Sequence, residues 1–288
     1  MRIDAHHHFW LYDPTVQVWM GPRHGPIRRS FLPSDLLPHL ASARIDGSIV
    51  VQAAQMLAET DFLLAEAASC SKIVGVVGWV DLCSPELPSQ LARYSGARKL
   101  VGVRHVVHDE PDDLFMARED FRRGIAALAQ AGLCYDLLLF PRHLRLACQL
   151  AASHPEVTFV LDHAGNPDLR REGLAEEERA RGLVAWEADL RALATLPNVN
   201  VKLSGLVTRA DWGAFIQADL EEAIRVALDA FGPTRCMVGS DWPVCTLSAA
   251  YGSTMGAVEQ YVARHLSAKD AGEVMGGTAA RVYKLQGV

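Results

Sequence analysis

The chain has 288 residues, of which 50% are hydrophobic and 22% charged, and its formal net charge is -6. This composition predicts a large buried core and excludes an intrinsically disordered chain. A negative net charge gives no electrostatic basis for binding nucleic acid or an anionic membrane. No apolar run reaches the roughly 20 residues that span a bilayer, and the N-terminus lacks a signal-peptide pattern.

Six scattered cysteines form no Cys-x-x-Cys pair. In a chain of this length, such cysteines are typical of small buried side chains rather than of disulfides or zinc ligands. We therefore expect a cytoplasmic protein with a small-molecule substrate and with neither nucleic acid nor membrane as a partner. The sequence leaves the oligomeric state open.

Eight short apolar segments alternate with helical patterns along the chain. The predicted strands are Ile3–Phe9, Gly47–Ala53, Ile73–Leu82, Leu100–Val107, Leu133–Phe140, Val157–His163, Val199–Leu203 and Cys236–Ser240. Several are almost continuously apolar, which is typical of parallel strands buried on both faces. Helical patterns between them include Thr60–Ser71, Arg118–Ala131, Pro141–Ser153 and Asp211–Phe231, with Thr60 as a capping residue and Gly132 as a helix stop.

Eight strand–helix units predict a (β/α)8 TIM-like barrel that forms one domain over residues 1–288. An open α/β sheet is the alternative, but no glycine-rich phosphate-binding pattern follows the first strand. Residues 11–33 are longer than a simple connection and would lie at the catalytic end of a barrel. They form either a lid or pocket wall, or an ordinary surface loop.

Polar side chains gather where the predicted strands end, which is where a barrel builds its active site. His6 and His8 are two residues apart in a strand and so share a face, whereas His7 points to the other face. Two converging imidazoles can bind a divalent metal or polarise an oxyanion. A purely structural role for the pair is the alternative.

Two further residues end buried strands, His163 on the sixth and Asp241 on the eighth. A carboxylate near several histidines can act as a general base or a metal ligand. The alternative for Asp241 is a capping or loop-bracing role. Together with His6 and His8, these residues form a candidate catalytic set, and the same four are candidate metal ligands.

Four other residues are candidate substrate contacts: Arg104, His105, Lys202 and Trp242. Arginine offers a planar fork of donors to carboxylate or hydroxyl oxygens. The competing interpretations are a pair with acidic residues of the next loop for Arg104, an ion pair inside the barrel for Lys202, and packing for Trp242.

The order of these motifs resembles the amidohydrolase superfamily, and within it the amidohydrolase-2, or amidohydrolase-related, group. The resemblance runs from residue 3 to about residue 283 and rests on Ile-Asp-Ala-His-His-His-Phe-Trp (3–10), Gly-Val-Arg-His (102–105), Leu-Asp-His-Ala-Gly-Asn-Pro (161–167), Lys-Leu-Ser-Gly-Leu (202–206) and Gly-Ser-Asp-Trp-Pro-Val (239–244). The group includes L-fuconolactonases, other sugar-lactone hydrolases and 2-pyrone-4,6-dicarboxylate lactonases. The likeness is greatest to the L-fuconolactonase type.

The resemblance implies that Asp241 deprotonates the attacking water and that His6, His8 and His163 polarise a lactone carbonyl, directly or through a metal. It also implies that Arg104 and His105 contact the substrate. Binuclear members carry a bridging lysine or glutamate on strand four and a histidine on strand five, which this sequence lacks. The sequence therefore leaves open whether the site binds one Zn²⁺ or other divalent metal, or works without a metal.

We accordingly expect a hydrolase of carbohydrate catabolism that opens a sugar lactone, with His105 or a neighbour protonating the leaving ring oxygen. A 2-pyrone-4,6-dicarboxylate-type lactonase is an alternative, but it would call for several converging arginines. A metal-dependent decarboxylase of the same superfamily is another. The third alternative is a non-catalytic barrel that binds sugar acids.

Overall fold

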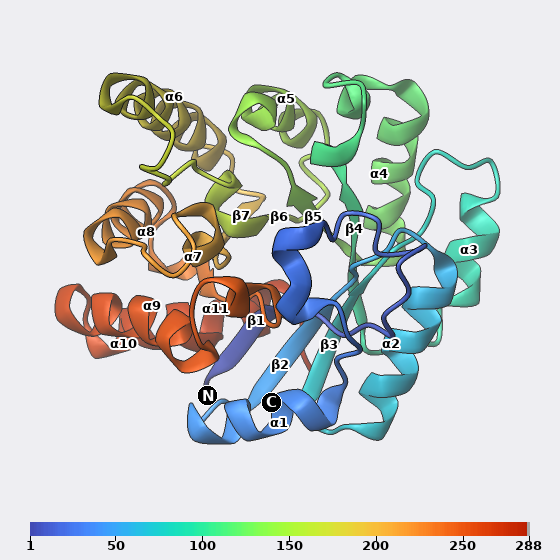
Figure 1. Ribbon diagram of the computed structural model, residues 1–288. Helices are drawn as coiled ribbons and strands as arrows, with labels where there is room; N and C mark the ends of the chain where they lie inside the picture. The colour runs from blue at the N-terminus through green and yellow to red at the C-terminus, as the bar shows by residue number, and fades with distance from the viewer. Residues whose placement is uncertain (287–288) are drawn as a thin grey trace.

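The computed structural model describes residues 1–286, and these contain one sheet of eight parallel strands in sequential order (Figure 1). The strands are β1 (Ile3–His7), β2 (Gly47–Val51), β3 (Ile73–Gly78), β4 (Leu100–Val106), β5 (Cys134–Leu138), β6 (Phe159–Leu161), β7 (Val199–Leu203) and β8 (Cys236–Val238). The first and last strands meet just beyond β8, where the Asp241 amide donates to the His6 carbonyl at 2.8 Å. The predicted barrel is confirmed, and the open sheet is excluded.

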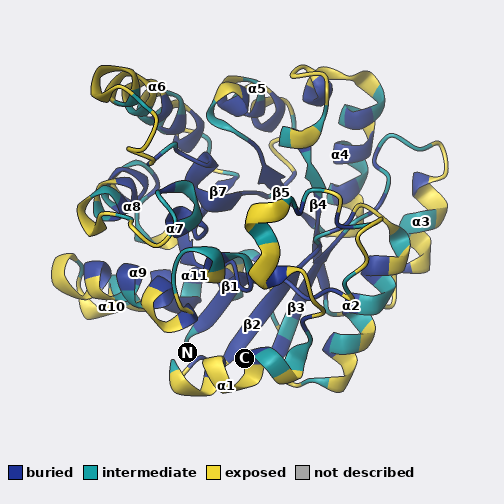
Figure 2. Cartoon of the chain, viewed as in Figure 1, coloured by how far each residue is buried: buried dark blue, intermediate teal, exposed yellow. Residues whose placement is uncertain are grey.

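Helices surround the strands and turn their apolar faces inward, so that burial is concentrated on the sheet and on the inner helix faces (Figure 2). The α-helices are α1 (Pro33–Ser42), α2 (Leu57–Ser69), α3 (Leu87–Arg93), α4 (Glu119–Ala131), α5 (Leu144–Ser153), α6 (Glu176–Ala194), α7 (Leu206–Arg209), α8 (Gln217–Phe231), α9 (Tyr251–His265), α10 (Ala268–Gly272) and α11 (Thr278–Val282). None of the helices in residues 1–286 has the length and apolar character to cross a membrane.

The observed bounds of α2 and β6 differ from the predicted ones, each for a physical reason. Thr60 does not cap α2, because its hydroxyl donates to the Trp79 carbonyl at 2.8 Å, and the helix begins three residues earlier. The predicted strand Val157–His163 ends at Leu161, and the chain then enters a short 3-10 turn (Asp162–Gly165). His163 has a φ of 54° in this turn, so its side chain does not continue the alternation of the strand.

Residues 11–33 cross the mouth of the barrel as a short helical turn over Pro22–Ile27 with loops on both sides (Figure 1). Its two ends are tied together, because Trp10 and Phe31 exchange backbone hydrogen bonds of 3.1 and 2.9 Å. The Trp10 indole also donates to the Arg29 carbonyl at 2.7 Å. The segment is therefore anchored to the barrel and forms part of the wall around its mouth.

The interior of the barrel holds a layer of buried charges. Lys202 is fully buried on β7, with its Nζ 2.5 Å from Asp136 Oδ2 and 3.0 Å from Asp162 Oδ1. Tyr283 follows α11 at the closed end of the barrel, and its hydroxyl donates a hydrogen bond of 2.8 Å to Asp136. Arg104 Nη1 completes the layer at 2.9 Å from Asp162 Oδ2. One ammonium thus separates two carboxylates that would otherwise repel each other.

We predict that Lys202→Met lowers the free energy of unfolding by about 3–5 kcal/mol, because it leaves the buried Asp136 without a charged partner and Asp162 with Arg104 as its remaining cation. Urea denaturation measures the change. The double variant Lys202→Met/Asp136→Asn should recover part of the loss, and Lys269→Met, at an exposed site, should change stability by at most about 0.5 kcal/mol. A single Lys202 variant as stable as the native protein would contradict the prediction.

Candidate active site

The end of β1 places two imidazoles beside a carboxylate that follows β8. His6 Nε2 and His8 Nε2 lie 3.2 Å apart. Asp241 Oδ1 lies 3.3 Å from His8 Nε2 and 3.9 Å from His6 Nε2. Asp241 has a φ of 57°, and its amide is held by His6, so the backbone fixes where the carboxylate points. His7 lies on the opposite face of the strand and contacts Ser48 Oγ at 3.0 Å, as the alternation of a strand requires.

The hydrogen bonds indicate which ring nitrogens are free. His8 Nδ1 lies 2.8 Å from the Val51 carbonyl oxygen, which can only accept, so we assign the proton to Nδ1 and the lone pair to Nε2. His163 Nδ1 contacts the Ser204 hydroxyl at 2.9 Å, which leaves its Nε2 as the free nitrogen. Gly205 permits this approach, because a Cβ there would lie 2.5 Å from His163 Nδ1.

His6 has a complete set of partners in either neutral tautomer. Its Nδ1 lies 3.2 Å from both Asp162 Oδ1 and Lys202 Nζ, so it can donate to the one or accept from the other. Its Nε2 lies 3.3 Å from Arg104 Nη1, a donor, and 3.2 Å from the His8 lone pair, an acceptor. In either tautomer, with a proton or with a lone pair at Nε2, both ring nitrogens of His6 therefore have a hydrogen-bond partner.

Burial sets the charge of this cluster. It lowers the pKa of His6 well below the ordinary value, and the neighbouring Lys202 adds to the effect. Burial also lowers the pKa of His163. Burial alone would raise the pKa of Asp162, but Lys202, His6 and Arg104 together hold it well below the usual range. At neutral pH the site therefore combines the neutral imidazoles of His6 and His163 with an ionised Asp162 and a permanently charged Arg104.

The donor set fits a metal ion. The ligand atoms of His6, His8 and Asp241 lie within 4.8 Å of one another. Two imidazoles and a carboxylate are a usual protein ligand set for catalytic zinc, which keeps a fourth position for water. His163 enters only a second possible set, with His6 and Asp162. That set is the poorer one, because the Asp162 oxygens already face Lys202 and Arg104.

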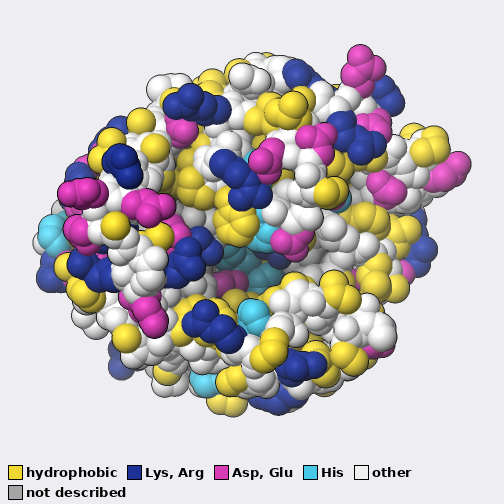
Figure 3. Space-filling view, turned by 45° about the horizontal axis from the view of Figure 1, so that its top comes forward, with side chains coloured by type: hydrophobic (Ala, Val, Ile, Leu, Met, Phe, Trp, Pro, Cys, Tyr) yellow, Lys and Arg dark blue, Asp and Glu magenta, His cyan; other side chains and the backbone are white. Residues whose placement is uncertain are grey.

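The cluster lies at the base of a cavity of about 300 Å³ at the mouth of the barrel. Figure 3 shows this hollow with histidine and acidic side chains at its base and basic side chains around its rim. An aromatic wall lines one side, in which successive rings are 6.1, 5.4 and 5.5 Å apart. The wall consists of Trp10, Trp19, His24 and Trp212. We call this space the mouth cavity.

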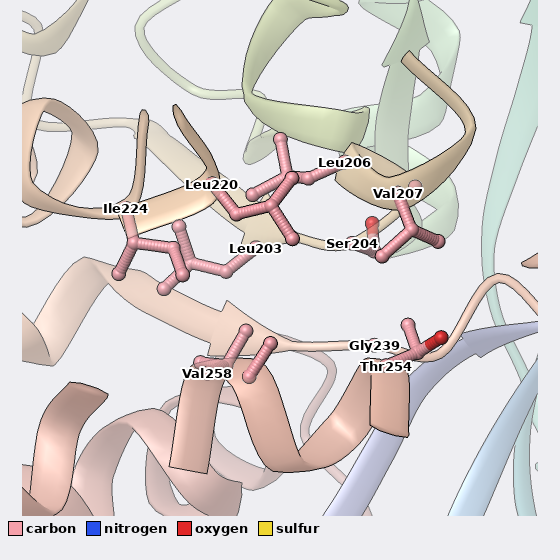
Figure 4. Close-up of a pocket in the computed structure, with 11 residues that line it drawn as sticks. Leu203, Ser204, Leu206, Val207, Leu220, Ile224, Gly239, Thr254 and Val258 are labelled. Carbon is pink, nitrogen blue, oxygen red and sulfur yellow. The ribbon is translucent and has the colours of Figure 1, made fainter. Parts of the chain in front are cut away.

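A second gap behind β7 and β8 is apolar and far smaller, at about 10 Å³ (Figure 4). Leucine, isoleucine and valine side chains of α7, α8 and α9 surround it, and the hydroxyls of Ser204 and Thr254 lie at its edge. This volume is only just sufficient for one water molecule. The gap is a packing feature of the helix layer, and the mouth cavity is the candidate substrate site.

The structure brings five of the eight predicted site residues to the mouth cavity: His8, Arg104, His163 and Asp241 line it, and His6 lies directly beneath. His105 points outward, where it pairs with Glu110 at 2.6 Å and stacks on Phe115. Lys202 is fully buried below the cluster. Trp242 packs against Phe9 and Phe31 and is 2% exposed. These three do not line the cavity, so we no longer expect them to contact the substrate.

Other residues of the cavity did not stand out in the sequence. His108 lines it from the short 3-10 turn Val107–Asp109 that follows β4, where the alternation of a strand no longer applies. Asn166 lines the cavity from within the motif that contains His163. Arg209, the last residue of α7, and Trp212, which follows that helix, also line the cavity.

Comparison with known proteins gives a consistent result. An amidohydrolase family model matches residues 3–285. A curated L-fucono-1,5-lactonase of Burkholderia multivorans is 43% identical, with 99% of this chain and 96% of that protein covered. An L-fucono-1,5-lactonase of Burkholderia ambifaria is 34% identical over 99% of this chain and 96% of that protein.

Two crystal structures of an amidohydrolase from Burkholderia multivorans superpose closely on this fold. The one with bound HEPES has a TM-score of 0.94 at 43% identity, and the one with bound zinc has a TM-score of 0.93 at 42% identity. In both cases 99% of this chain and 99% of the other chain are covered. The chain belongs to the amidohydrolase family.

Proposed function

We propose that the chain hydrolyses a sugar lactone of the L-fucono-1,5-lactone class to the corresponding acid. The observation that carries the proposal is the Asp241 carboxylate, which is 4% exposed at the base of the mouth cavity and lies 3.3 Å from His8 Nε2 and 3.9 Å from His6 Nε2. The L-fucono-1,5-lactonases of Burkholderia, which are 43% and 34% identical over nearly the whole chain, support the substrate class.

In the proposed mechanism, Asp241 takes a proton from a water molecule, and the oxygen of that water attacks the lactone carbonyl. Arg104 and the free Nε2 of His163 stand where they can donate to the carbonyl oxygen as it becomes negative, an effect typically worth about 3–4 kcal/mol for a good donor. The tetrahedral intermediate then breaks its bond to the ring oxygen. Protonated Asp241 returns its proton to that oxygen, which leaves an open-chain acid.

Asp241 replaces His105 as the source of the leaving-group proton. His105 lies outside the mouth cavity and is engaged by Glu110, so it cannot reach a ring oxygen there. His108 does line the cavity, but burial and the nearby Arg104 lower its pKa to about 3. A neutral imidazole is a poor acid at neutral pH, which leaves the carboxyl of Asp241 as the group that can both take and return the proton.

His6, His8 and Asp241 would hold a zinc ion, which when bound would polarise a carbonyl and lower the pKa of a bound water. Arg104 Nη1 lies 3.3 Å from His6 Nε2, so a dication there would be close to a permanent positive charge. This repulsion weakens zinc binding relative to the same three ligands alone. The guanidinium already supplies positive charge for the carbonyl oxygen. We therefore propose that zinc can bind but is not required for turnover.

We predict that Asp241→Asn lowers kcat for L-fucono-1,5-lactone by about 10²- to 10⁴-fold, because the amide can neither accept nor return the proton. A pH-indicator assay measures acid release above the spontaneous rate. The control is Asp112→Asn, an exposed site where the new side chain can still accept from the Leu114 amide. Near-native turnover by a folded Asp241 variant would refute the assignment of the base.

We predict that exhaustively chelated protein keeps at least about half of its turnover, because Arg104 and the imidazoles stabilise the oxyanion without a metal. The same assay before and after chelation tests this point. Calorimetric titration with Zn²⁺ gives a second readout, and we expect His8→Ala to abolish the binding. If chelation abolished turnover and one equivalent of zinc restored it, the metal would be essential and the proposal of metal-independent hydrolysis would be wrong.

The lactone panel also discriminates between the alternatives. A 2-pyrone-4,6-dicarboxylate would place two carboxylates near the carbonyl, but Arg104 is already paired with Asp162. Structural likeness to decarboxylases is at 13% identity and shows the fold alone. Release of CO₂ from an unsaturated acid without hydrolysis of any lactone would favour the decarboxylase, and binding without turnover would favour the sugar-acid-binding barrel.

A further inference from the structure

The first strand carries a β-bulge immediately before the candidate active site. Asp4 pairs with Ser48 of β2, and His7 pairs with Val50, so β1 has two residues between these pairs where β2 has one. A bulge of this kind leaves an extra residue without a partner and re-aims the side chains that follow it. It therefore decides which of the three consecutive histidines of β1 face the mouth of the barrel.

The side chains at the bulge show its effect. Ala5 belongs to the apolar cluster of the barrel interior. His6 is the next residue, and its ring also lies inside, with Nδ1 3.2 Å from Lys202 Nζ. Strict alternation after Ala5 would turn His6 and His8 toward the helices and His7 toward the interior. The bulge therefore places the two imidazoles of the candidate site on the side of the mouth cavity.

The carboxylate of Asp4 spans the bulge and reaches the end of β8. Its Oδ1 accepts from the His6 amide at 3.2 Å and from the Ser240 amide at 2.8 Å. Its Oδ2 accepts from the Ser240 hydroxyl at 2.6 Å and from the Tyr251 hydroxyl of α9 at 3.1 Å. Asp4 is fully buried and forms no ion pair in the part of the chain that the structure describes. Four N–H and O–H donors, rather than a cation, therefore hold this carboxylate.

The backbone around Asp241 depends on the same contacts. Asp241 has a φ of 57°, a conformation that residues other than glycine rarely adopt and that the surrounding structure must hold. The residue before it, Ser240, is fixed to Asp4 through both its amide and its hydroxyl. The residue after it, Trp242, donates its amide to the Ser240 hydroxyl at 3.0 Å. Asp4 thus holds, directly or through Ser240, the chain on both sides of the proposed base.

We propose that Asp4 is a positioning residue for the candidate site. Its carboxylate holds the bulge of β1 and the end of β8 together, and so fixes the distance between Asp241 and the imidazoles of His6 and His8. The kinetic test of this inference rests on the proposed lactone hydrolysis, to which it adds a residue that does not line the mouth cavity. Because a backbone amide can only donate, the property required of residue 4 is an acceptor oxygen rather than a negative charge.

Two substitutions of Asp4 separate these properties. Asp4→Asn keeps one oxygen for the two amides, and its Nδ2 can donate to the hydroxyls of Ser240 and Tyr251, which can also accept. Asp4→Ala leaves both amides without an acceptor. We expect Asp4→Ala to lower kcat for L-fucono-1,5-lactone about 10²-fold, the size of effect that a misplacement of about 1 Å produces, with KM changed by at most about threefold. Asp4→Asn should keep kcat within about fivefold of the native value. Native kcat in folded Asp4→Ala, or equal losses in the two variants, would overturn the proposal.

A second pair of variants tests the same link if Asp4→Ala does not fold. Ser240→Ala and Tyr251→Phe each remove one hydroxyl that donates to Asp4 Oδ2, but Ser240 belongs to the chain that carries Asp241, whereas Tyr251 belongs to the helix layer. Both should lose about 1–2 kcal/mol of stability in urea denaturation. Only Ser240→Ala should also lower kcat, by about tenfold. A purely structural role for Asp4 predicts the same kcat for both variants, and that result would reject the inference.

Crystal structures of the native protein and of the folded variant, Asp4→Ala or Ser240→Ala, give a readout that needs no substrate. We expect the distance between Asp241 Oδ1 and His8 Nε2, which is 3.3 Å in the native chain, to change by about 1 Å in the variant. An unchanged site would reject this inference and leave the proposed function intact. If the native protein hydrolysed no lactone, the proposed function would be rejected, and the two structures would still decide the role of Asp4.

Discussion

The buried ammonium of Lys202 between two carboxylates is the interaction on which the rest of the site depends. It balances Asp136 and Asp162 in the interior of the barrel, where neither could stay ionised alone without a large desolvation cost. Asp162 in turn contacts Arg104 and His6. The charge of Lys202, which lies below the cavity, therefore helps to position the Arg104 guanidinium and the His6 imidazole of the candidate site.

The same interaction links the two ends of the barrel. Tyr283 donates to Asp136 from the closed end, while His6 belongs to the mouth. Between them the contacts run without a solvent-exposed member, so they operate at a low effective dielectric. The site is consequently built from the sheet interior outward, and the loops around the mouth complete it by adding the walls of the cavity.

The sequence predicts the barrel, and the gathering of the candidate site residues at its mouth, for one physical reason. The carboxyl ends of parallel strands meet on one face, so a histidine or aspartate at such an end is placed by topology alone. His6, His8, His163 and Asp241 follow this rule. His105 does not line the cavity, because the alternation along β4 turns Arg104 inward and His105 outward.

Features that depend on tertiary contacts were not available from local patterns. The hydroxyl of Thr60 is used by a neighbouring strand, so a good capping residue did not mark the start of α2. Trp242 follows Asp241 in the sequence, yet its ring packs against Phe9 and Phe31. The cavity walls come from irregular segments, and no periodicity indicates where such segments return to the mouth.

The anchoring of residues 11–33 has a consequence for how enzymes on this scaffold diversify. Both ends of the segment are tied together by the Trp10–Phe31 backbone pair, so its interior can lengthen, shorten or change composition while its points of entry and exit stay fixed. Trp19 and His24, which line the mouth cavity, lie inside that loop, whereas the proposed catalytic residues lie at the ends of the strands. Related enzymes can therefore acquire new ligand preferences by exchange of one contiguous stretch, with the chemistry inherited unchanged.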